Sequence, residues 1–482
     1  HTLALEQQHE RVTQPQWGTP LLRDASNAVL GEVRIDPRTR GLNYNAIDGR
    51  YQQDVTWARS ILTWAVAPAV QATHTLYHYD ALRDYENIET ATFVNGNTQV
   101  QRSNALRQRH DQQVFGSRAE VSLRTALAGL RSDFAFGWDY AFNRQTRYPQ
   151  SVAGPFDSTD PYRPADLAFY ATPGITPALA PDATNRLHMA ALFAENRTVF
   201  APGWALTSGL RADTIGLSRR WQRAVSASNP EVYERRYRPV TGRLGVVHDL
   251  AHEWQVYALY STAADPPSGV LSTAGFSALR DFELTRGRQV ELGTKAGFDA
   301  RRGELAFALY DIVRENLATT DPNDRTRVVA VGRQSSRGAE LSLRWRPAAP
   351  WQLGLQLAWT RAVYDEFTEV VGTQAVSRAG NRPSNVPDVV AGASAAWTPA
   401  PGWTFLGEWR YVGKRFADTA NTAWEGAYDL FNLGVRWQMA PEWMLTARVY
   451  NAGDRTYAAT LGTNLAVLGA PRTVQAVLDW RF

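Results

Sequence analysis

The sequence of 482 residues predicts an all-β protein, a transmembrane antiparallel β-barrel made of one domain. Three observations predict this fold. Segments in which apolar and polar residues alternate recur along the chain, their connections alternate between short and long, and a Trp follows several of the short connections. Alternation marks strands with one apolar face, and its repetition with tight turns on one rim and long loops on the other is typical of barrels that cross a membrane.

The composition agrees with such a barrel. The mean hydropathy is −0.37, and no run approaches the roughly 18 consecutive apolar residues that a spanning helix needs. Barrels hide their hydrophobicity because alternate residues face a polar lumen. The chain has 17 Trp, 19 Tyr and 18 Phe, the kind of aromatic content that barrels use at membrane interfaces. It has no Cys, which fits an exported protein.

The C-terminal segment shows the alternation most clearly. Val474, Ala476, Leu478 and Trp480 alternate with mainly polar residues, and the chain stops on the aromatic Phe482. We predict that this strand turns its apolar face outward, toward lipid. The last edge strand of a soluble sandwich would alternate too. However, the apolar faces of several other predicted strands also carry Trp, and a soluble core would not be lined by Trp so regularly.

Each alternating segment is taken as one strand, which gives eighteen. The predicted strands are residues 2–11, 50–66, 70–83, 110–127, 129–143, 184–200, 203–220, 233–250, 253–263, 286–299, 303–316, 327–346, 351–365, 385–398, 403–414, 427–438, 442–451 and 472–482.

The connections between these strands separate into two classes. Short ones, such as Ala67-Pro68-Ala69, are predicted to be turns on one rim. Long ones are predicted to be external loops on the other rim, at residues 12–49, 84–109, 144–183, 264–285, 366–384 and 452–471. This asymmetry places the turns on the periplasmic side and the loops outside the cell.

A Trp stands just after five of the short turns. We predict that these residues form a periplasmic aromatic girdle. They are Trp204, Trp254, Trp351, Trp403 and Trp443.

The C-terminal half resembles the TonB-dependent siderophore receptors. The resemblance lies in successive strand motifs that match in order and spacing. They include Arg288-Gln-Val-Glu-Leu-Gly293, Val331-Gly-Arg-Gln-Ser-Ser-Arg-Gly338, Tyr428-Asp-Leu-Phe-Asn432 and Val449-Tyr-Asn-Ala-Gly-Asp454. The N-terminal half is less similar, although Gly18-Thr-Pro-Leu-Leu, which follows the first predicted strand, resembles the family's loop at that place.

The resemblance implies a barrel of about 22 strands around an N-terminal plug. Eighteen strands are visible, so we expect residues 1–482 to be an N-terminally truncated β-barrel domain. The plug, the TonB-contacting segment and about four strands would then precede His1. An even strand count would also permit a complete eighteen-stranded porin.

The resemblance also implies the function. We expect a receptor of the Gram-negative outer membrane that takes up a ferric siderophore, with TonB supplying the energy. Alternatives are a passive porin-like channel, or a TonB-dependent receptor for cobalamin, haem or a sugar, although the long loops carry few His to ligate haem. Expected partners are the siderophore, the TonB complex, outer-membrane lipid and, through Leu478, Trp480 and Phe482, the barrel-assembly machinery. Nucleic acid is not expected, since 51 basic and 47 acidic residues are interspersed.

Aromatic and basic residues of the long loops and adjoining strand ends are the candidate ligand site. Such a surface could hold a flat, partly anionic ferric chelate by stacking, cation–π contacts and hydrogen bonds, although loop aromatics also pack on one another for stability. The candidates are Arg147, Tyr148, Phe156, Tyr162, Arg163, Phe169, Tyr170, Tyr260, Phe276, Arg361, Tyr364 and Phe367.

No pattern supports catalysis, a resident cofactor or a metal site. His252-Glu253 begins like a zinc-protease motif, but the second His is missing. A hydrolase assembled from distant loop residues is the one enzyme class left open. Charged residues on the polar faces of the strands are expected to form a hydrated lumen wall or to contact the plug. They are Glu291, Lys295, Glu340, Arg344, Glu408, Arg410, Arg436 and Arg448.

Overall fold

The computed structural model describes residues 1–223, 225–226, 230–265, 283–320 and 328–481. Within these ranges the chain is mainly β-strand, with two short 3₁₀ helices, η1 (Pro37–Thr39) and η2 (Phe169–Ala171). No helix in the described part is long and apolar enough to cross a membrane.

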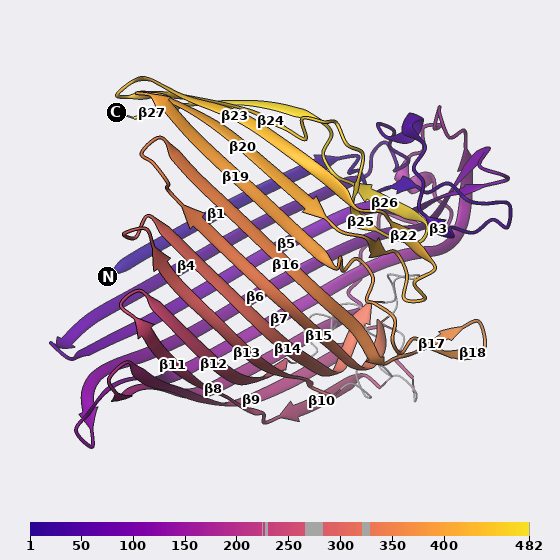
Figure 1. Cartoon of the computed structure of the whole chain (residues 1–482). Helices are drawn as coiled ribbons and strands as arrows, with labels where there is room; N and C mark the ends of the chain where they lie inside the picture. The colour runs from indigo at the N-terminus through magenta and orange to yellow at the C-terminus, as the bar shows by residue number, and fades with distance from the viewer. Residues whose placement is uncertain (224, 227–229, 266–282, 321–327, 482) are drawn as a thin grey trace.

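One large antiparallel sheet contains 19 of the described strands (Figure 1). They are β1 (Thr2–Thr13), β4 (Arg50–Ala67), β5 (Val70–Val94), β6 (Gln99–Leu127), β7 (Leu130–Thr159), β8 (Ala183–Ala201), β9 (Trp204–Trp221), β10 (Val232–Tyr237), β11 (Val240–Ala251), β12 (Trp254–Asp265), β13 (Thr285–Phe298), β14 (Gly303–Thr320), β15 (Val328–Trp345), β16 (Trp351–Glu366), β19 (Val389–Ala400), β20 (Trp403–Val412), β23 (Tyr428–Ala440), β24 (Trp443–Tyr450) and β27 (Thr473–Trp480).

Each of these strands pairs with its neighbours along the chain, and every one of the eighteen predicted strands has a counterpart. The sheet has 19 strands instead of the predicted 18 because the predicted strand 233–250 is divided into β10 and β11. Both pair with β9, so together they form one interrupted strand. Pro239 lies at the interruption, and proline has no backbone N–H to donate to a neighbouring strand.

Eight short strands form small sheets among the loops. They are β2 (Thr19–Pro20), β3 (Gly31–Glu32), β17 (Thr368–Val371), β18 (Gln374–Ser377), β21 (Arg415–Phe416), β22 (Ala423–Glu425), β25 (Ala458–Leu461) and β26 (Leu465–Leu468).

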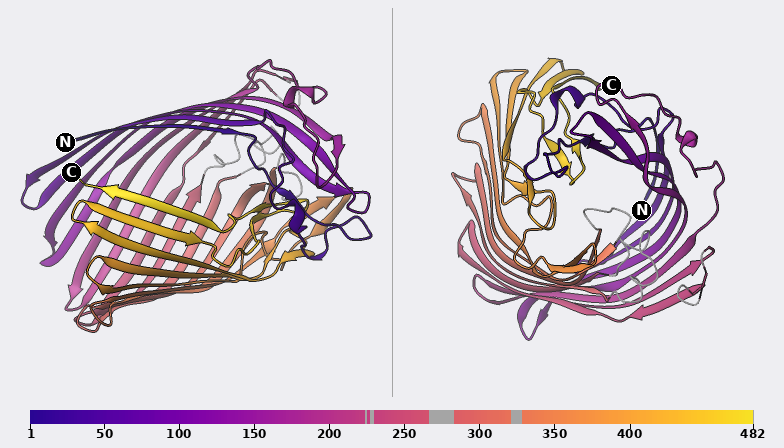
Figure 2. Two further views of the ribbon diagram at one scale, coloured as in Figure 1. Left: turned by 90° about the horizontal axis from the view of Figure 1, so that it is seen from above. Right: turned by 90° about the vertical axis from the view of Figure 1, so that its right-hand side faces the viewer.

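The sheet curls around a central lumen (Figure 2). Tight turns lie at one end, with both chain termini, and the long connections gather at the other. We call these the turn end and the loop end. Among the described residues, β1 pairs only with β4 and β27 only with β24, so the ring has a seam between them.

The loops bridge this seam at the loop end. β2 pairs with β26, and β3 runs parallel to β22, so segments from the two ends of the chain share small sheets. The Arg40 guanidinium donates to both carboxylate oxygens of Asp454, at 2.8 and 3.2 Å. The loop end is therefore held together although the seam strands are not paired.

Two predicted loops contain long strand extensions. β5 and β6 continue through most of 84–109 and are joined by a turn at 95–98, and β7 runs through 144–159. The predicted loop at 84–109 was wrong, and the one at 144–183 begins only after Thr159, because these extensions pass beyond the apolar band. Neither face contacts lipid at that height, so the alternation that identifies spanning strands is lost.

The outward face of the sheet is apolar. Leu192 is 69% exposed, Leu210 66% and Val474 73%, as side chains that face lipid would be. The opposite face carries the charged residues of the lumen. This division confirms the barrel prediction, including the outward apolar face of the C-terminal strand.

Tyrosines of the lumen wall cover glycines on the next strand. Tyr77 lies across from Gly116, Tyr257 from Gly293 and Tyr310 from Gly338. An added Cβ at Gly293 would lie 2.5 Å from the Tyr257 ring. The missing side chains therefore make room for the rings, which shield the bare backbone from the lumen.

Candidate functional site

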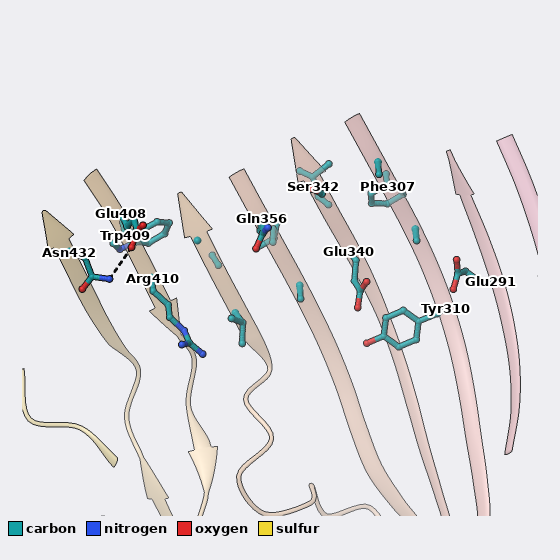
Figure 3. A pocket seen from close by; sticks show the side chains of 18 of the residues that line it. Glu291, Phe307, Tyr310, Glu340, Ser342, Gln356, Glu408, Trp409, Arg410 and Asn432 are labelled. Carbon is teal, nitrogen blue, oxygen red and sulfur yellow. Dashed lines mark hydrogen bonds between the residues drawn. The ribbon is translucent and has the colours of Figure 1, made fainter. Parts of the chain in front are cut away.

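A hollow on the lumen wall spans the middle of β13 to β23 (Figure 3). Its volume is about 800 Å³. The cross-strand register places its polar side chains on the inward face, with Phe307 and Trp409 turned to the other side. Four of the predicted lumen charges line it, Glu291, Glu340, Glu408 and Arg410.

Two carboxylates of this wall, Glu291 and Glu408, are held by neutral donors. The Tyr257 hydroxyl donates to Glu291 at 2.6 Å, and the Gln289 amide donates to its other oxygen at 2.7 Å. The Asn432 amide donates to Glu408 at 3.1 Å. The wall is therefore a hydrated acidic surface, well suited to contact water, a passing ligand or a polar segment of protein in the lumen.

A second site lies at the loop end, on the inward face of β5 to β9. Arg83, His110 and Arg147 are successive cross-strand neighbours. The Arg83 guanidinium can only donate, so its 3.0 Å contact makes His110 Nδ1 an acceptor and leaves the ring proton on Nε2. The Gln108 amide contacts Nε2, and its oxygen is the atom that can accept this proton. We call Arg83, His110, Arg147 and Arg219 the mouth cluster.

Burial sets the charge of the mouth cluster. It lowers the pKa of His110 to about 3, with Arg83 and Arg147 adding to the effect, so the ring is neutral at ordinary pH. It also lowers the pKa of Arg219 to about 10, with Arg147 contributing. The Arg147 pKa is lowered in the same way, against the opposing effect of Asp182, which lies 3.6 Å away. Desolvation, the larger cause, disfavours charge of either sign, and the repulsion among the arginines is the part that a bound anion would relieve.

The mouth cluster lies beyond the apolar band. From the turn end of β6 at Leu127 to His110 is 17 residues, about 40 Å along the barrel axis at ~3.3 Å per residue and ~45° tilt. The apolar band of such barrels is about 25 Å tall.

The low pKa of His110 predicts a specific acid sensitivity. In the unfolded chain the pKa of His110 would be about 6.5. Above that pH the ring is neutral in both states and the folded protein has its full stability. As the pH falls toward 3, the unfolded chain binds a proton that the folded protein does not, so the free energy of unfolding decreases. At pH 5 the loss is about 2 kcal/mol. We expect the thermal midpoint of the full-length protein in detergent to fall between pH 7.5 and 5, and to fall less in H110Q. An identical fall in both proteins would contradict this assignment.

Three of the predicted ligand residues pack together instead of facing a ligand. Phe156, Phe169 and Tyr170 join an apolar cluster with Ile88 and Ile175. Phe169 is completely buried.

This packing anchors the loop after β7. The Tyr170 hydroxyl donates to Glu86, which also lies 3.1 Å from Arg50 and 3.5 Å from Arg107. Arg107 donates back to the loop at the Thr176 carbonyl, 3.3 Å away. The network lies on the opposite face of the sheet from the mouth cluster.

Breaking this network should release the loop. In E86Q two guanidiniums face a neutral amide, and removing one partner of a buried ion pair costs about 3–5 kcal/mol. We expect chymotrypsin to cleave the full-length protein after Tyr170, which Ala171 follows, at least about tenfold faster, since the open fraction rises tenfold per ~1.4 kcal/mol. The control is E6Q, because Glu6 pairs with Arg59 at an exposed position. Equal cleavage of the two variants would show that Glu86 does not hold the loop.

The other loop candidates occupy separate places. Tyr162 lies under the Arg38 guanidinium, 3.8 Å from its ring centre, and Arg163 is exposed. The rings of Tyr364 and Phe367 pack together with centroids 4.9 Å apart, and both are buried. Tyr148 lies beside Arg109, on the face opposite to Arg147.

Two candidates face away from the lumen. Tyr260 lies in the middle of β12 on the outward face, 47% exposed, and Arg361 lies on the outward face of β16. They were selected by closeness to loops, but in a strand the side of each residue follows from alternation. Phe276 lies outside the described residues. Of the predicted set, the structure brings only Arg147 into the mouth cluster.

The sequence analysis missed Arg83, His110 and Arg219. Each lies at, or one residue from, the end of its predicted strand, and no face was assigned to these end positions. Applying the alternation up to the strand ends would have placed all three on the inward side.

The five Trp of the predicted girdle all lie at the turn end on the outward face. Their exposures are 38% for Trp204, Trp351 and Trp403, 39% for Trp443 and 50% for Trp254. Several stack on further aromatics, as Trp403 does on Trp437 with centroids 5.0 Å apart.

In the C-terminal strand, Leu478 and Trp480 are 55% and 58% exposed on the outward face, and Trp480 stacks on Trp443. Phe482 lies outside the described residues. In the part of the chain that is described, no group of three or more acidic or His side chains is arranged to hold a metal ion.

A sequence profile described as TonB dependent receptor-like, beta-barrel matches residues 5–452. Over 251 residues the chain is 28% identical to the ferrichrome outer membrane transporter/phage receptor of Escherichia coli (strain K12), a match that covers 50% of this chain and 32% of that protein. It is 24% identical over 257 residues to the ferrioxamine receptor of Yersinia enterocolitica, covering 52% and 34%. The match therefore spans about a third of the length of these relatives.

Solved structures share the fold. The siderophore receptor PiuA from Acinetobacter baumannii superposes with a TM-score of 0.86 at 18% identity, covering 99% of this chain and 71% of that one. The ferric-catecholate import receptor Fiu from Escherichia coli K12, in its closed form, gives 0.80 at 16% identity, covering 100% and 72%.

Proposed function

This chain belongs to the family of TonB-dependent receptor-like β-barrels, and we propose that it forms the barrel of a receptor that imports a ferric siderophore with energy delivered through TonB. Barrels of this family lie in the outer membrane of Gram-negative bacteria, so the loop end faces outside and the turn end faces the periplasm. The similar ferrichrome and ferrioxamine receptors support iron chelates as the substrate class.

The observation that carries the proposal is the mouth cluster at the outer entrance of a wide polar lumen. Its arginines repel one another, and an anionic ligand such as a ferric chelate with acidic oxygens would relieve that repulsion. The acidic wall below would repel such an anion, so it would not hold the chelate as tightly as the mouth does.

We also propose that further strands of the full-length protein complete the ring and that a plug fills the lumen. In the described part of the chain, β1 and β27 each leave one edge unpaired, and an open edge is a template for another strand. The polar donors and carboxylates of the lumen wall offer a surface on which a plug could rest.

The test is uptake by cells. The full-length gene is expressed in an Escherichia coli strain without its own siderophore receptors, and radioactive iron is supplied as ferrichrome, ferrioxamine, pyoverdine or catecholate chelates. We expect saturable uptake of at least one chelate that disappears in a strain without TonB. Non-saturable uptake that does not require TonB would instead support the passive channel.

A further inference from the structure

An arginine pair stands on the outward face of the barrel, above a column of aromatic side chains. On β7 the outward positions run Phe134, Phe136, Trp138, Tyr140 and Phe142, and the next one is Arg144. Arg144 pairs across the strands with Arg186 of β8. Both arginines are exposed.

The height of this pair places it at the outer surface of the membrane. Arg144 lies 14 residues from the turn end of β7 at Leu130, and Arg186 lies 14 residues from Phe200 at the turn end of β8. At ~3.3 Å per residue and ~45° tilt, both lie about 33 Å up the barrel axis. The apolar band is about 25 Å tall, so the guanidiniums reach the head groups of the outer leaflet.

The last rings of the column lie directly below the arginines. Phe142 and His188 are cross-strand neighbours with ring centroids 4.6 Å apart. Tyr140 and His188 are joined through the Tyr hydroxyl and Nδ1 at 3.5 Å. Rings with polar atoms at this level are typical of the boundary between acyl chains and head groups.

The two positive charges face each other without an acidic partner in the described part of the chain, where no carboxylate lies within 4 Å of either guanidinium. Like charges directly opposite on a sheet are unfavourable. The acidic residues nearby on this face bond to other groups: Asp80 to Gln113, Asp111 to Arg109, Glu231 to Arg220 and Glu234 to Ser218.

We propose that Arg144 and Arg186 bind the phosphate of a phosphorylated outer-leaflet lipid, whose acyl chains lie along the aromatic column of β7. Planar guanidiniums bind phosphate oxygens in pairs, which relieves the repulsion between the two cations. The acyl chains supply a second, apolar contact that a free phosphate ion lacks. This assignment rests on the membrane position of the barrel and is independent of which ligand enters the lumen.

The test is lipid binding by the purified full-length protein in detergent. The probe is a bisphosphorylated lipid A, and binding is measured by native mass spectrometry across a concentration series. The variant is R144Q/R186Q, and R144K/R186K keeps the charge. The matched control is R118Q, because Arg118 is an exposed arginine on the inward face of the neighbouring strand β6.

We expect R144Q/R186Q to bind at least about tenfold more weakly than wild type, R144K/R186K to be intermediate, and R118Q to be unchanged. Dephosphorylated lipid should bind wild type and R144Q/R186Q equally weakly. Equal affinity of wild type and R144Q/R186Q for the phosphorylated lipid would overturn the proposal. Displacement of that lipid by 10 mM inorganic phosphate would overturn the lipid as the occupant. Heat-dependent mobility on gels verifies that each variant is folded.

Discussion

Replacing Arg219 by Gln is expected to weaken capture of the transported chelate at least about thirtyfold, about 2 kcal/mol. Arg219 is 2% exposed, and its guanidinium lies 4.5 Å from the ring centre of Trp221. A charge held in so dry a place acts strongly on an anion because little water screens it, and losing one partner of a buried charge contact typically costs about 2–5 kcal/mol.

The measurement is the concentration dependence of iron uptake in the cell assay described above, with the chelate that the wild type transports. We expect the half-saturating concentration to rise and the maximal rate to change little, because the mouth acts before transport. The control is R163Q, which removes the same charge from an exposed loop position. If R163Q weakened uptake as much as R219Q, general attraction by the positive surface would explain the effect and the mouth cluster would not.

Replacing Gly137 by Ala is expected to prevent most of the chain from folding into a barrel. Gly137 lies in β7, and an added Cβ would come within 1.9 Å of the Ala119 carbonyl oxygen on β6. That atom belongs to the backbone of the paired strand, so the two strands must separate locally. Overpacking costs about 1–3 kcal/mol when side chains can adjust, and a backbone clash in a ladder is at the upper end of that range or beyond it.

The folded fraction in isolated outer membranes, read from heat-dependent mobility on gels, measures this effect. The matched control is Gly407→Ala in β20, where an added Cβ meets nothing within 4 Å. Alanine there should be harmless or slightly favourable, since glycine weakens strand interiors. A normal folded fraction in G137A would mean that β6 and β7 tolerate a shift that this structure does not contain.

The spanning strands and their order could be read from the sequence because lipid imposes one rule on all of them. Leu192, Leu210 and Val474 must face outward, and the residues between them must face the lumen. The turns could be recognised because each is short and five are followed by Trp. The strand extensions near Tyr85 and Tyr148 could not, because outside the lipid both faces of a strand can be polar.

The candidate site was only partly predictable. Arg147 was among the predicted residues and lies in the mouth cluster, but Phe169 is buried under its own loop and Tyr260 faces outward. Loop composition identifies residue types that bind ligands, and the same types also stabilise long loops. Which role each has depends on the loop's packing partners, such as Glu86 for Tyr170.

The sequence by itself determined the barrel and the direction of each spanning strand, because alternation and turn spacing are local properties. The resemblance to the family came separately, from the strand motifs of the C-terminal half. Only the tertiary structure decided that Arg83, His110, Arg147 and Arg219 meet, that Arg144 opposes Arg186, and that loops of the two chain ends join across the seam. These depend on register between strands far apart in sequence, where a shift of one residue turns a side chain to the other face.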